Sequence, residues 1–402
     1  MMDSRQRTPS SSSLHFRHEW IDGDPPCGRL SFCAATDLTG NGQDDVIVGG
    51  IGSRHNVYLN GSATRIPSPT AIKETLGFPE QNLFWYENPG WVRHDIASCR
   101  RLGIGHALGD IDGNGRTDIV AGSPLHFDEV YWFRQPADPG GEWQRYTVVD
   151  GYEKYHDLAV ADADDDGRQE VVALSQEGRT LLYADIPEDP TQSPWPADCR
   201  HVVDDDVKAE GLDILDIDGD GRSEIIAGTN VYHRSEDGEN WERRHVLSGW
   251  DDVRVATGDL DDDGRPEVVF AEGDSPTFGT HMGRVAWCDP ADWEPHFLDE
   301  DLFCPHSLQL ADFTGNGSLD VFVGEMSLGE NDDPELCVYV NDGNARFEKR
   351  VISRGIATHE AKVADLTGTE RADIVGKSYD PDHHVDVWYN QWDSEAQPQR
   401  TP

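Results

Sequence analysis

The chain has 402 residues, 36% of them hydrophobic, and a formal charge of −44 that arises from 77 Asp and Glu against 33 Lys and Arg. Such an acidic surface suits high salt, where screening removes self-repulsion, and it disfavours binding to nucleic acid or to an anionic membrane. The first residues contain no apolar signal region, and no later stretch approaches the length of a membrane span. We therefore expect a halophilic, cytoplasmic protein with neither of those partners.

Cysteine usage agrees with a reducing compartment. The chain has seven Cys, an odd number, and none of them stands in a CxxC spacing. This pattern indicates neither a zinc ribbon nor a disulfide framework. We expect reduced thiols.

The two ends of the chain have the composition of disordered tails. Residues 1–13 are rich in Ser, and residues 393–402 consist mostly of Gln, Pro and charged side chains. Between them, residues 14–392 are predicted to form one domain. The first strand expected in this domain is LHFRHEWI, from Leu14 to Ile21.

Seven copies of one phrase then follow, in which an apolar strand leads into a loop of alternating carboxylates and glycines and a second strand opens on an acid. The copies begin at Asp37, Asp110, Asp162, Asp216, Asp259, Asp312 and Asp365. A repeated unit that cannot bury its own apolar face must stack on its neighbours. The repeat therefore predicts one array and not several separate domains.

Each unit contains two further strands. An aromatic strand such as LFWYENP (Leu83 to Pro89) is followed by an outer strand such as WVRHDIAS (Trp91 to Ser98). Four strands make a propeller blade, but the last unit ends at Trp388 and Tyr389 without its outer strand. The phrase at Leu14 to Ile21 supplies it. We predict an all-β, seven-bladed β-propeller closed by the N-terminal strand, with a long loop or lid inserted at Ser53 to Gly77 in the first blade.

The acidic loops carry oxygen ligands at every second position, with Gly permitting positive φ, as a hard cation requires. We predict structural Ca²⁺ in the four richest loops. Their ligand sets are Asp110, Asp112, Asn114, Asp118; Asp162, Asp164, Asp166, Glu170; Asp216, Asp218, Asp220, Glu224; and Asp259, Asp261, Asp263, Glu267.

Two further loops are expected to bind Ca²⁺ more weakly, because Thr39 and Thr314 replace the second carboxylate. Their remaining ligands are Asp37, Asn41, Asp45 and Asp312, Asn316, Asp320. The seventh loop has Thr at both Thr367 and Thr369, and its site is expected to be empty. An EF-hand is excluded because the closing acid follows the first by eight residues and the flanks have strand character. The alternative is a network of Asx turns without metal.

The spacing D-x-D-x-D-G-x-x-D/E between strands resembles the FG-GAP or VCBS repeats of integrin-α-like seven-bladed propellers. The resemblance covers nearly the whole chain. It implies that the metal loops are structural and join the inner strand to the next strand at the bottom of the propeller. What the protein binds or transforms must then be sought elsewhere.

If the acidic loops lie at the bottom, the start of each inner strand lies at the top, next to the central axis. His156, Glu210, His306 and His359 all stand six residues before the first Asp of their unit, and His106 stands four before. Equivalent positions around an axis converge. Converging imidazoles can hold Zn²⁺ or another transition metal, or act as acid and base, although His at a strand start can also be a hydrogen-bonding filler between blades.

The candidate catalytic residues are therefore His106, Tyr155, His156, Arg254, His306 and His359. Arg254 could hold a carboxylate or an oxyanion, and His or Tyr could serve as base. His383 and His384 form a pair in a polar turn, which we expect to be solvated.

Two functions follow from these residues. The first is a lyase or dehydratase that acts on a sugar or oligosaccharide by β-elimination at the top face. The phrases WYENP and GHALGDIDG also give a looser resemblance to carbohydrate-active propellers, namely polysaccharide lyases and the propeller half of aldos-2-ulose dehydratase, whose cupin domains are absent here. The second is a non-catalytic propeller, stabilised by Ca²⁺, that binds a protein or a glycan. In either case we expect a monomer.

Overall fold

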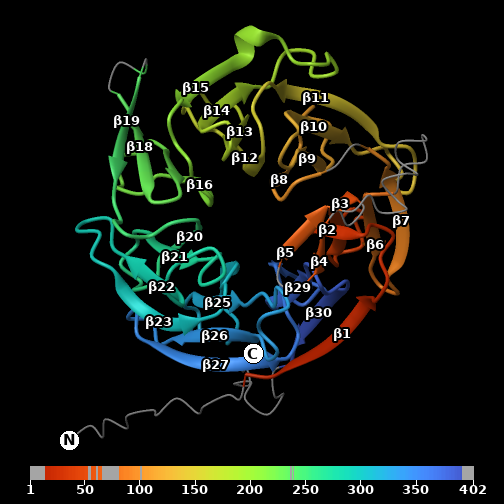
Figure 1. The fold of residues 1–402 in the computed structure, drawn as a ribbon. Helices are drawn as coiled ribbons and strands as arrows, with labels where there is room; N and C mark the ends of the chain where they lie inside the picture. Colours follow the sequence, from red (N-terminus) through yellow and green to blue (C-terminus); the bar gives the residue numbers. More distant parts are fainter. Residues whose placement is uncertain are drawn as a thin grey trace, which may run out of the picture.

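The computed structural model describes residues 14–52, 56–59, 62–65, 81–99, 102–235, 238 and 240–391. In these residues the strands form seven four-stranded antiparallel sheets and one two-stranded hairpin, and the one short helix is η1, a 3₁₀ turn (Ala197–Cys199). Figure 1 shows the sheets following one another around a central axis. The protein is the seven-bladed β-propeller that the repeats predict.

The blades are numbered in chain order, with strands named from the axis outward. Blade 1 is β2 (Arg29–Thr36), β3 (Asp45–Gly52), β6 (Leu83–Glu87) and β7 (Val92–Ala97). Blade 2 is β8 (His106–Gly109), β9 (Asp118–Gly122), β10 (Glu129–Arg134) and β11 (Gln144–Asp150). Blade 3 is β12 (Tyr155–Ala161), β13 (Glu170–Ser175), β14 (Thr180–Asp185) and β15 (Arg200–Asp204).

The remaining blades follow the same order. Blade 4 is β16 (Leu212–Leu215), β17 (Glu224–Ala227), β18 (Asn230–Arg234) and β19 (Trp241–His245). Blade 5 is β20 (Val253–Gly258), β21 (Glu267–Glu272), β22 (Gly283–Cys288) and β23 (His296–Leu302). Blade 6 is β24 (Ser307–Ala311), β25 (Asp320–Gly324), β26 (Glu335–Asn341) and β27 (Phe347–Arg354).

Blade 7 joins the two ends of the chain. It consists of β28 (Glu360–Ala364), β29 (Asp373–Lys377), β30 (Val385–Asn390) and, outermost, the N-terminal strand β1 (Phe16–Asp22). Strand β1 pairs antiparallel with β30, with Phe16 opposite Asn390. The predicted closure by the N-terminal strand is confirmed.

The apolar core lies between blades and not within them. The middle strands are buried along their whole length, as in β9, β25 and β29, because each faces a neighbouring sheet on both sides. Seven apolar clusters fill the seven interfaces of the described residues. Between blades 7 and 1, for example, Val375 and Val387 pack with Val48 and Phe84. Stacking therefore stabilises a ring whose units could not fold alone.

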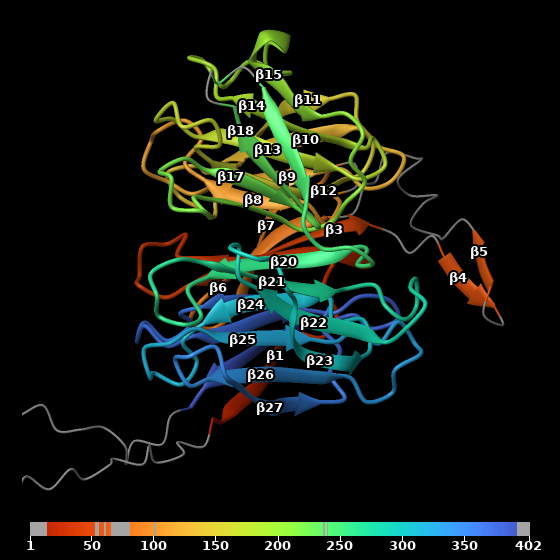
Figure 2. The ribbon, with the colours of Figure 1, turned by 90° about the vertical axis from the view of Figure 1, so that its left-hand side faces the viewer.

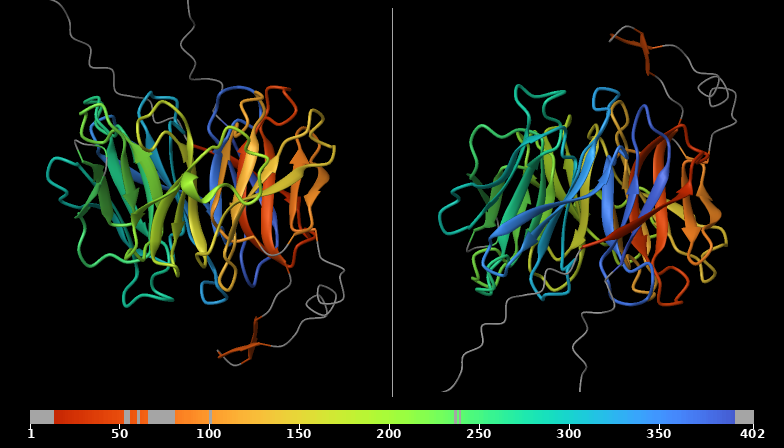
Figure 3. Two further views of the ribbon diagram at one scale, coloured as in Figure 1. Left: turned by 90° about the horizontal axis from the view of Figure 1, so that it is seen from above. Right: turned by 90° about the horizontal axis from the view of Figure 1, so that it is seen from below.

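The insertion in blade 1 contains a hairpin of β4 (Asn56–Leu59) and β5 (Ser62–Arg65), where we expected only a loop. Figures 2 and 3 show this hairpin extending from one face of the ring. It follows the end of β3, so it lies on the face where the inner strands begin. The rest of the insertion and the predicted tails, residues 1–13 and 393–402, fall outside the described residues.

Candidate functional site

Every acidic loop joins the first strand of a blade to the second, so all seven lie on one face, which we call the loop face. The first carboxylate of a loop accepts hydrogen bonds from main-chain N–H groups three to five residues later. Asp37 accepts them from Gly40, Asn41 and Gly42 at 2.7, 3.1 and 2.7 Å. This turn needs positive φ three residues after the first Asp. Gly provides it in five loops, and Asp165 and Asp262 adopt it at 59° and 61°.

The closing acid of each loop is buried and holds the loop by accepting hydrogen bonds from main-chain N–H groups. Glu170 accepts a hydrogen bond from the N–H of Ala163 at 2.8 Å, and Asp45 accepts from Leu38 and from Asn88 in the third strand, at 3.0 and 2.8 Å. Burial raises the pKa of Glu170 to about 8 and that of Asp45 to about 6, because its effect exceeds the lowering effect of these hydrogen bonds. Carboxylates that cluster in this way raise one another's pKa, and a cation would relieve the repulsion.

The structure gathers the predicted metal ligands to different degrees. In the third loop Asp162, Asp164, Asp166 and Glu170 each place an oxygen within 4.8 Å of the others. The second loop gathers Asp110, Asp112 and Asp118, and the fourth gathers Asp216, Asp218 and Asp220. In the first and sixth loops, Asn41 and Asn316 instead donate their amide hydrogens to main-chain carbonyls at 2.6 and 2.9 Å. Carboxylate oxygens gathered in this way are the kind of ligand that a hard cation prefers.

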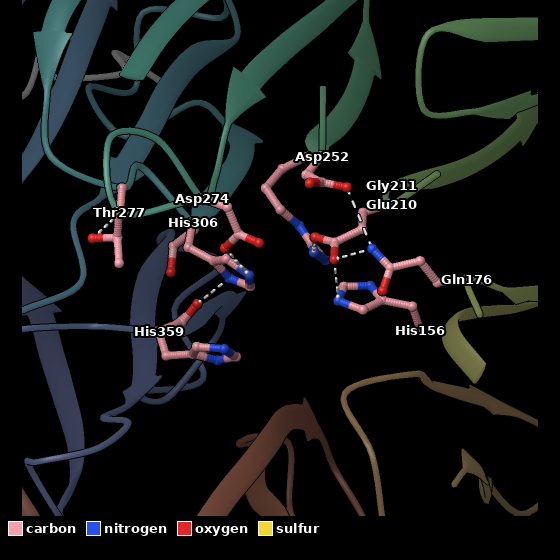
Figure 4. A network of polar contacts seen from close by, with 12 residues as sticks. His156, Gln176, Glu210, Gly211, Asp252, Asp274, Thr277, His306 and His359 are labelled. Carbon is pink, nitrogen blue, oxygen red and sulfur yellow. Dashed lines mark hydrogen bonds and ion pairs between the residues drawn. The ribbon is translucent and has the colours of Figure 1, made fainter. Parts of the chain in front are cut away.

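The opposite face, which we call the pocket face, is hollowed at the axis by a cavity of about 540 Å³. Its lining comes from the starts of inner strands and from the loops that join the second and third strands of the blades. His156, Glu210, His306 and His359 all line it. The predicted convergence of these four equivalent positions is therefore a feature of the structure, and Figure 4 shows His156 and Glu210 across a gap from His306 and His359.

Three side chains at the floor of the cavity could hold a metal ion. Glu210, Asp274 and His306 each place one ligand atom within 4.8 Å of the others. His306 donates from Nδ1 to the main-chain carbonyl of His359 at 2.8 Å, so Nε2 keeps its lone pair and lies 3.9 Å from Asp274 Oδ1. Burial lowers the pKa of His306 well below its usual value, and burial with the Glu210 charge raises that of Asp274 to about 7. An imidazole lone pair beside two crowded carboxylates fits a divalent cation.

His156 lies between two carboxylates from different blades. It donates from Nδ1 to Asp157 at 2.8 Å, and its Nε2 lies 3.1 Å from Glu210 Oε1. Arg254 bridges the same two acids, at 3.2 Å from Asp157 and 3.5 Å from Glu210. Burial alone would raise the pKa of Asp157, but Arg254, His156 and the N–H of Gly211 hold it well below the usual range. The network ties blades 3, 4 and 5 together at the floor.

His359 belongs to a stack on the other side of the cavity. Its ring lies 4.2 Å from that of His306 and 4.4 Å from that of Tyr379. The Nζ atom of Lys377 lies 2.5 Å from His359 Nδ1 and donates to the carbonyl of Leu30 at 3.3 Å. Burial lowers the pKa of Lys377 to about 7 and that of His359 well below its usual value. At neutral pH both imidazoles of the stack are thus uncharged.

Two other predicted residues are placed differently from these four. His106 lines a separate cavity of about 270 Å³ with Lys362 and Gln309, where its ring stacks on Phe32 and its Nε2 lies 3.8 Å from Glu360. His106 stands only four residues before the first Asp of its unit, two fewer than the other positions, and this places it deeper along the axis. The buried ring of Tyr155 packs in the apolar cluster between blades 2 and 3. The expectation that His106 would join the His156 group is wrong, whereas Tyr155 also lines the cavity of His156 although its ring turns into the core.

The His383 and His384 pair is also not solvated, contrary to our expectation. His383 Nε2 donates to the carbonyl of Cys27 at 2.5 Å. His384 Nδ1 contacts the fully buried Asp386, which also accepts a hydrogen bond from His18 at 2.7 Å. These bonds hold the turn before β30 against β30 itself, and they connect it to strand β1 and to the segment that leads into β2. The pair is therefore structural.

Sequence reasoning missed Asp274, Lys377 and Gln176. Asp274 follows the second strand of blade 5, and Gln176, which donates to Glu210 at 2.7 Å, follows the second strand of blade 3. Because the second strand returns to the pocket face, a polar residue just after it also lies near the axis. This signal was available in the sequence. Lys377 had none, since it ends an apolar strand and is buried inside blade 7.

Comparisons with known proteins agree with this architecture. A family model described as FG-GAP-like repeat matches residues 110–173 and 216–270. Similar solved structures include the V. cholerae biofilm matrix protein Bap1, with 13% identity, TM-score 0.51, and 96% of this chain and 92% of that chain covered. Rhamnogalacturonan lyase YesW gives 13%, 0.51, 94% and 77%, and streptogramin B lyase gives 9%, 0.53, 95% and 100%. No curated protein sequence matches significantly.

Fold and site together define a seven-bladed β-propeller with carboxylate-rich loops on one face and a polar axial pocket on the other. A model of FG-GAP-like repeats matches its residues 110–173 and 216–270, in agreement with the resemblance seen in the spacing of the acidic loops. The likeness to the solved structures extends to the fold, and it includes a polysaccharide lyase. No helix in the described residues has the length and hydropathy needed to cross a membrane.

Proposed function

We propose that the protein is a carbohydrate-active lyase or dehydratase that performs β-elimination on a sugar or oligosaccharide in the pocket. The observation that carries the proposal is the convergence of His156, Glu210, Asp274, His306 and His359 around one cavity. A purely adhesive surface does not require such a group of titratable side chains. The fold shared with a polysaccharide lyase is compatible with this function but does not establish it.

His156 is the base in this proposal. Asp157 accepts the Nδ1 proton at 2.8 Å, and a cation held by Glu210 would leave Nε2, which lies 3.1 Å from Glu210 Oε1 at the cavity, with a free lone pair. Nε2 takes the proton from the carbon next to a carboxyl or keto group, and the electron pair of that C–H bond forms the new C=C bond. The C–O bond at the adjacent carbon breaks, and its oxygen leaves with the bonding pair and takes a proton from solvent. Asp157 stabilises the imidazolium that forms.

Glu210, Asp274 and His306 would hold a Zn²⁺ or another divalent metal ion. When bound, such an ion supplies positive charge to the carboxyl or keto oxygen on which charge develops. Arg254 already neutralises Asp157 and Glu210, so its role is to keep both acids ionised and oriented. Metal analysis should show one transition-metal ion fewer per chain in Glu210→Gln and Asp274→Asn than in the unaltered protein.

Variants at the two histidines test the enzyme directly. With a panel of uronides and ketoses, His156→Ala and His306→Ala should each lower the rate of unsaturated product formation by about 10²- to 10⁴-fold, the usual effect of losing a base or a metal ligand. Absorbance of the new double bond is the readout. His245→Ala is the control, because His245 lies on the outer strand β19 and its ring contacts only the Thr229 hydroxyl, at 3.4 Å, among the contacts described for it. Unchanged turnover in both variants would remove the proposed site.

We also propose that the acidic loops bind structural Ca²⁺. The ion would neutralise the clustered carboxylates of each loop, and it would bind only the folded ring, where these carboxylates are held together. When the free Ca²⁺ concentration is about 100 times the dissociation constant of a site, binding there adds about 2.7 kcal/mol to the free energy of unfolding. Chelation should therefore lower the melting temperature, and added Ca²⁺ should restore it, whereas Asp164→Asn should show a smaller shift. An identical melting curve with and without chelator would favour Asx turns alone.

The setting proposed for this reaction is the cytoplasm, with the protein acting as a monomer at high salt. The seven cysteines, all within the described residues, form no disulfide. This is what a reducing compartment permits.

A further inference from the structure

The mouth of the pocket carries apolar side chains that its polar floor does not require. Phe278 is 72% exposed and Leu125 is 43% exposed, and both line the cavity together with Leu328. None of the three belongs to the seven inter-blade clusters. We call these three residues the rim. Apolar side chains that gather at one pocket, unlike those scattered singly over a surface, favour contact with a ligand.

The rim surrounds the opening. Leu125 comes from the β9–β10 loop of blade 2, Phe278 from the β21–β22 loop of blade 5 and Leu328 from the β25–β26 loop of blade 6. Blades 2 and 5 stand on opposite sides of a ring of seven (Figure 1). A molecule seated on the floor would therefore be flanked by apolar side chains from both sides where it leaves the cavity.

The backbone is strained at one of these positions. Leu328 has a φ of 48°, in the left-handed region that bulky residues rarely adopt, and Gly329 follows at 70°. A glycine at position 328 would relieve this strain at no steric cost. Strain of this kind persists where the surrounding structure holds a residue in place, so the position of Leu328 at the rim is fixed.

Charge and size limit the ligand further. The cavity lining contains four carboxylates and three cationic side chains, so it suits a sugar derivative with one carboxylate better than a polyanionic polymer. A cavity of about 540 Å³ is within the range of small-molecule sites. It has room for a sugar on the floor and one ring-sized apolar group at the mouth.

We infer that the substrate is a single sugar unit that carries an apolar aglycone, not a polyuronate chain. The part of this inference that concerns the sugar rests on the proposed function, because the titratable side chains at the floor of the cavity would act on the sugar. The apolar end rests on the rim alone. Leu125, Phe278 and Leu328 determine specificity by contacting the aglycone.

Calorimetric titration with two matched probes tests the inference. Phenyl β-D-glucuronide and methyl β-D-glucuronide share the sugar and differ only in the apolar group. The unaltered protein should bind the phenyl compound about tenfold more tightly, as burial of a small apolar surface predicts. In Leu125→Ser/Phe278→Ser the two affinities should differ less than twofold, and the affinity for the methyl compound should not change.

A matched double variant serves as control. Val202→Ser/Val351→Ser alters two side chains that are 48% and 40% exposed on the outer strands β15 and β27, far from the axis, and should keep the tenfold preference. Equal affinities in the unaltered protein, absence of binding by both probes, or tighter binding of a polygalacturonate oligomer would each overturn the inference. Because binding is measured without turnover, a phenyl preference without product formation would reject only the β-elimination. Turnover of both compounds with equal affinities would reject only the rim.

Discussion

Removal of residues 1–22 is expected to open the ring and leave no stable monomer. Strand β1 is the outer strand of blade 7, and Phe16 is 7% exposed against Phe313, with ring centroids 6.1 Å apart. Without β1, the unpaired edge of β30 also becomes a template for association. Size-exclusion chromatography and a melting curve would detect aggregation and loss of the cooperative transition.

Two variants bracket this experiment. A chain that begins at residue 14 keeps β1 and should melt like the full chain. Phe16→Ala keeps the strand but creates a cavity between blades 6 and 7, and should lower the free energy of unfolding by about 3–5 kcal/mol. If the 1–22 deletion melted cooperatively at the original temperature, closure by the N-terminal strand would not contribute to stability.

Asp157→Ala is expected to lower the free energy of unfolding by about 3 kcal/mol at neutral pH. The change leaves Arg254, whose side chain is 12% exposed, without its hydrogen-bonded partner at 3.2 Å, and it frees His156 Nδ1. The pair links blades 3 and 5 across blade 4, so the loss acts on the ring and not on one blade. Urea unfolding measures the difference.

The pH dependence of this difference has a definite sign. The pKa of Asp157 lies well below the usual 3.8 in the folded protein, so the carboxylate stabilises the fold at pH values above 3.8. This contribution is lost as the pH falls below 3.8 towards the folded-state pKa. The gap between Asp157→Ala and the unaltered protein should therefore be full at pH 7 and should narrow under acidic conditions.

An exposed ion pair provides the control. Arg179 and Asp206 are 50% and 78% exposed, and Asp206→Ala should produce no measurable change. Arg254→Met combined with Asp157→Ala should cost less than the two single changes added together, because the partners share one interaction. Additive losses would show that Asp157 and Arg254 act independently.

The fold followed from the sequence because its evidence is local and repeated. Each acidic loop needs its own carboxylates and its own residue with positive φ, and each neighbouring strand needs its own apolar pattern, so seven copies gave the same answer seven times. Even closure was predictable, since Leu14 to Ile21 has the outer-strand pattern without an inner strand before it. The hairpin β4–β5 was not, because it lies in the one segment that has no counterpart in the other blades.

The site was predictable only as far as symmetry extends. His156, Glu210, His306 and His359 hold equivalent positions, and the axis brings equivalent positions together. His106 departs from this rule by two residues, and that shift along the strand moved it into another cavity. Tyr155 is next to His156 in the chain, but successive side chains of a strand point to opposite sides, so its ring entered the core.

The sequence by itself determined the number of blades, the way the ring closes and the face on which the acidic loops lie. These depend on periodic contacts between neighbouring strands. Only the tertiary structure decided that Asp274 joins Glu210 and His306, that Lys377 lies against His359 and that Phe278 stands at the pocket mouth. Such contacts join different blades through loops of unequal length. Their geometry is set by the closed ring as a whole, and no local pattern encodes it.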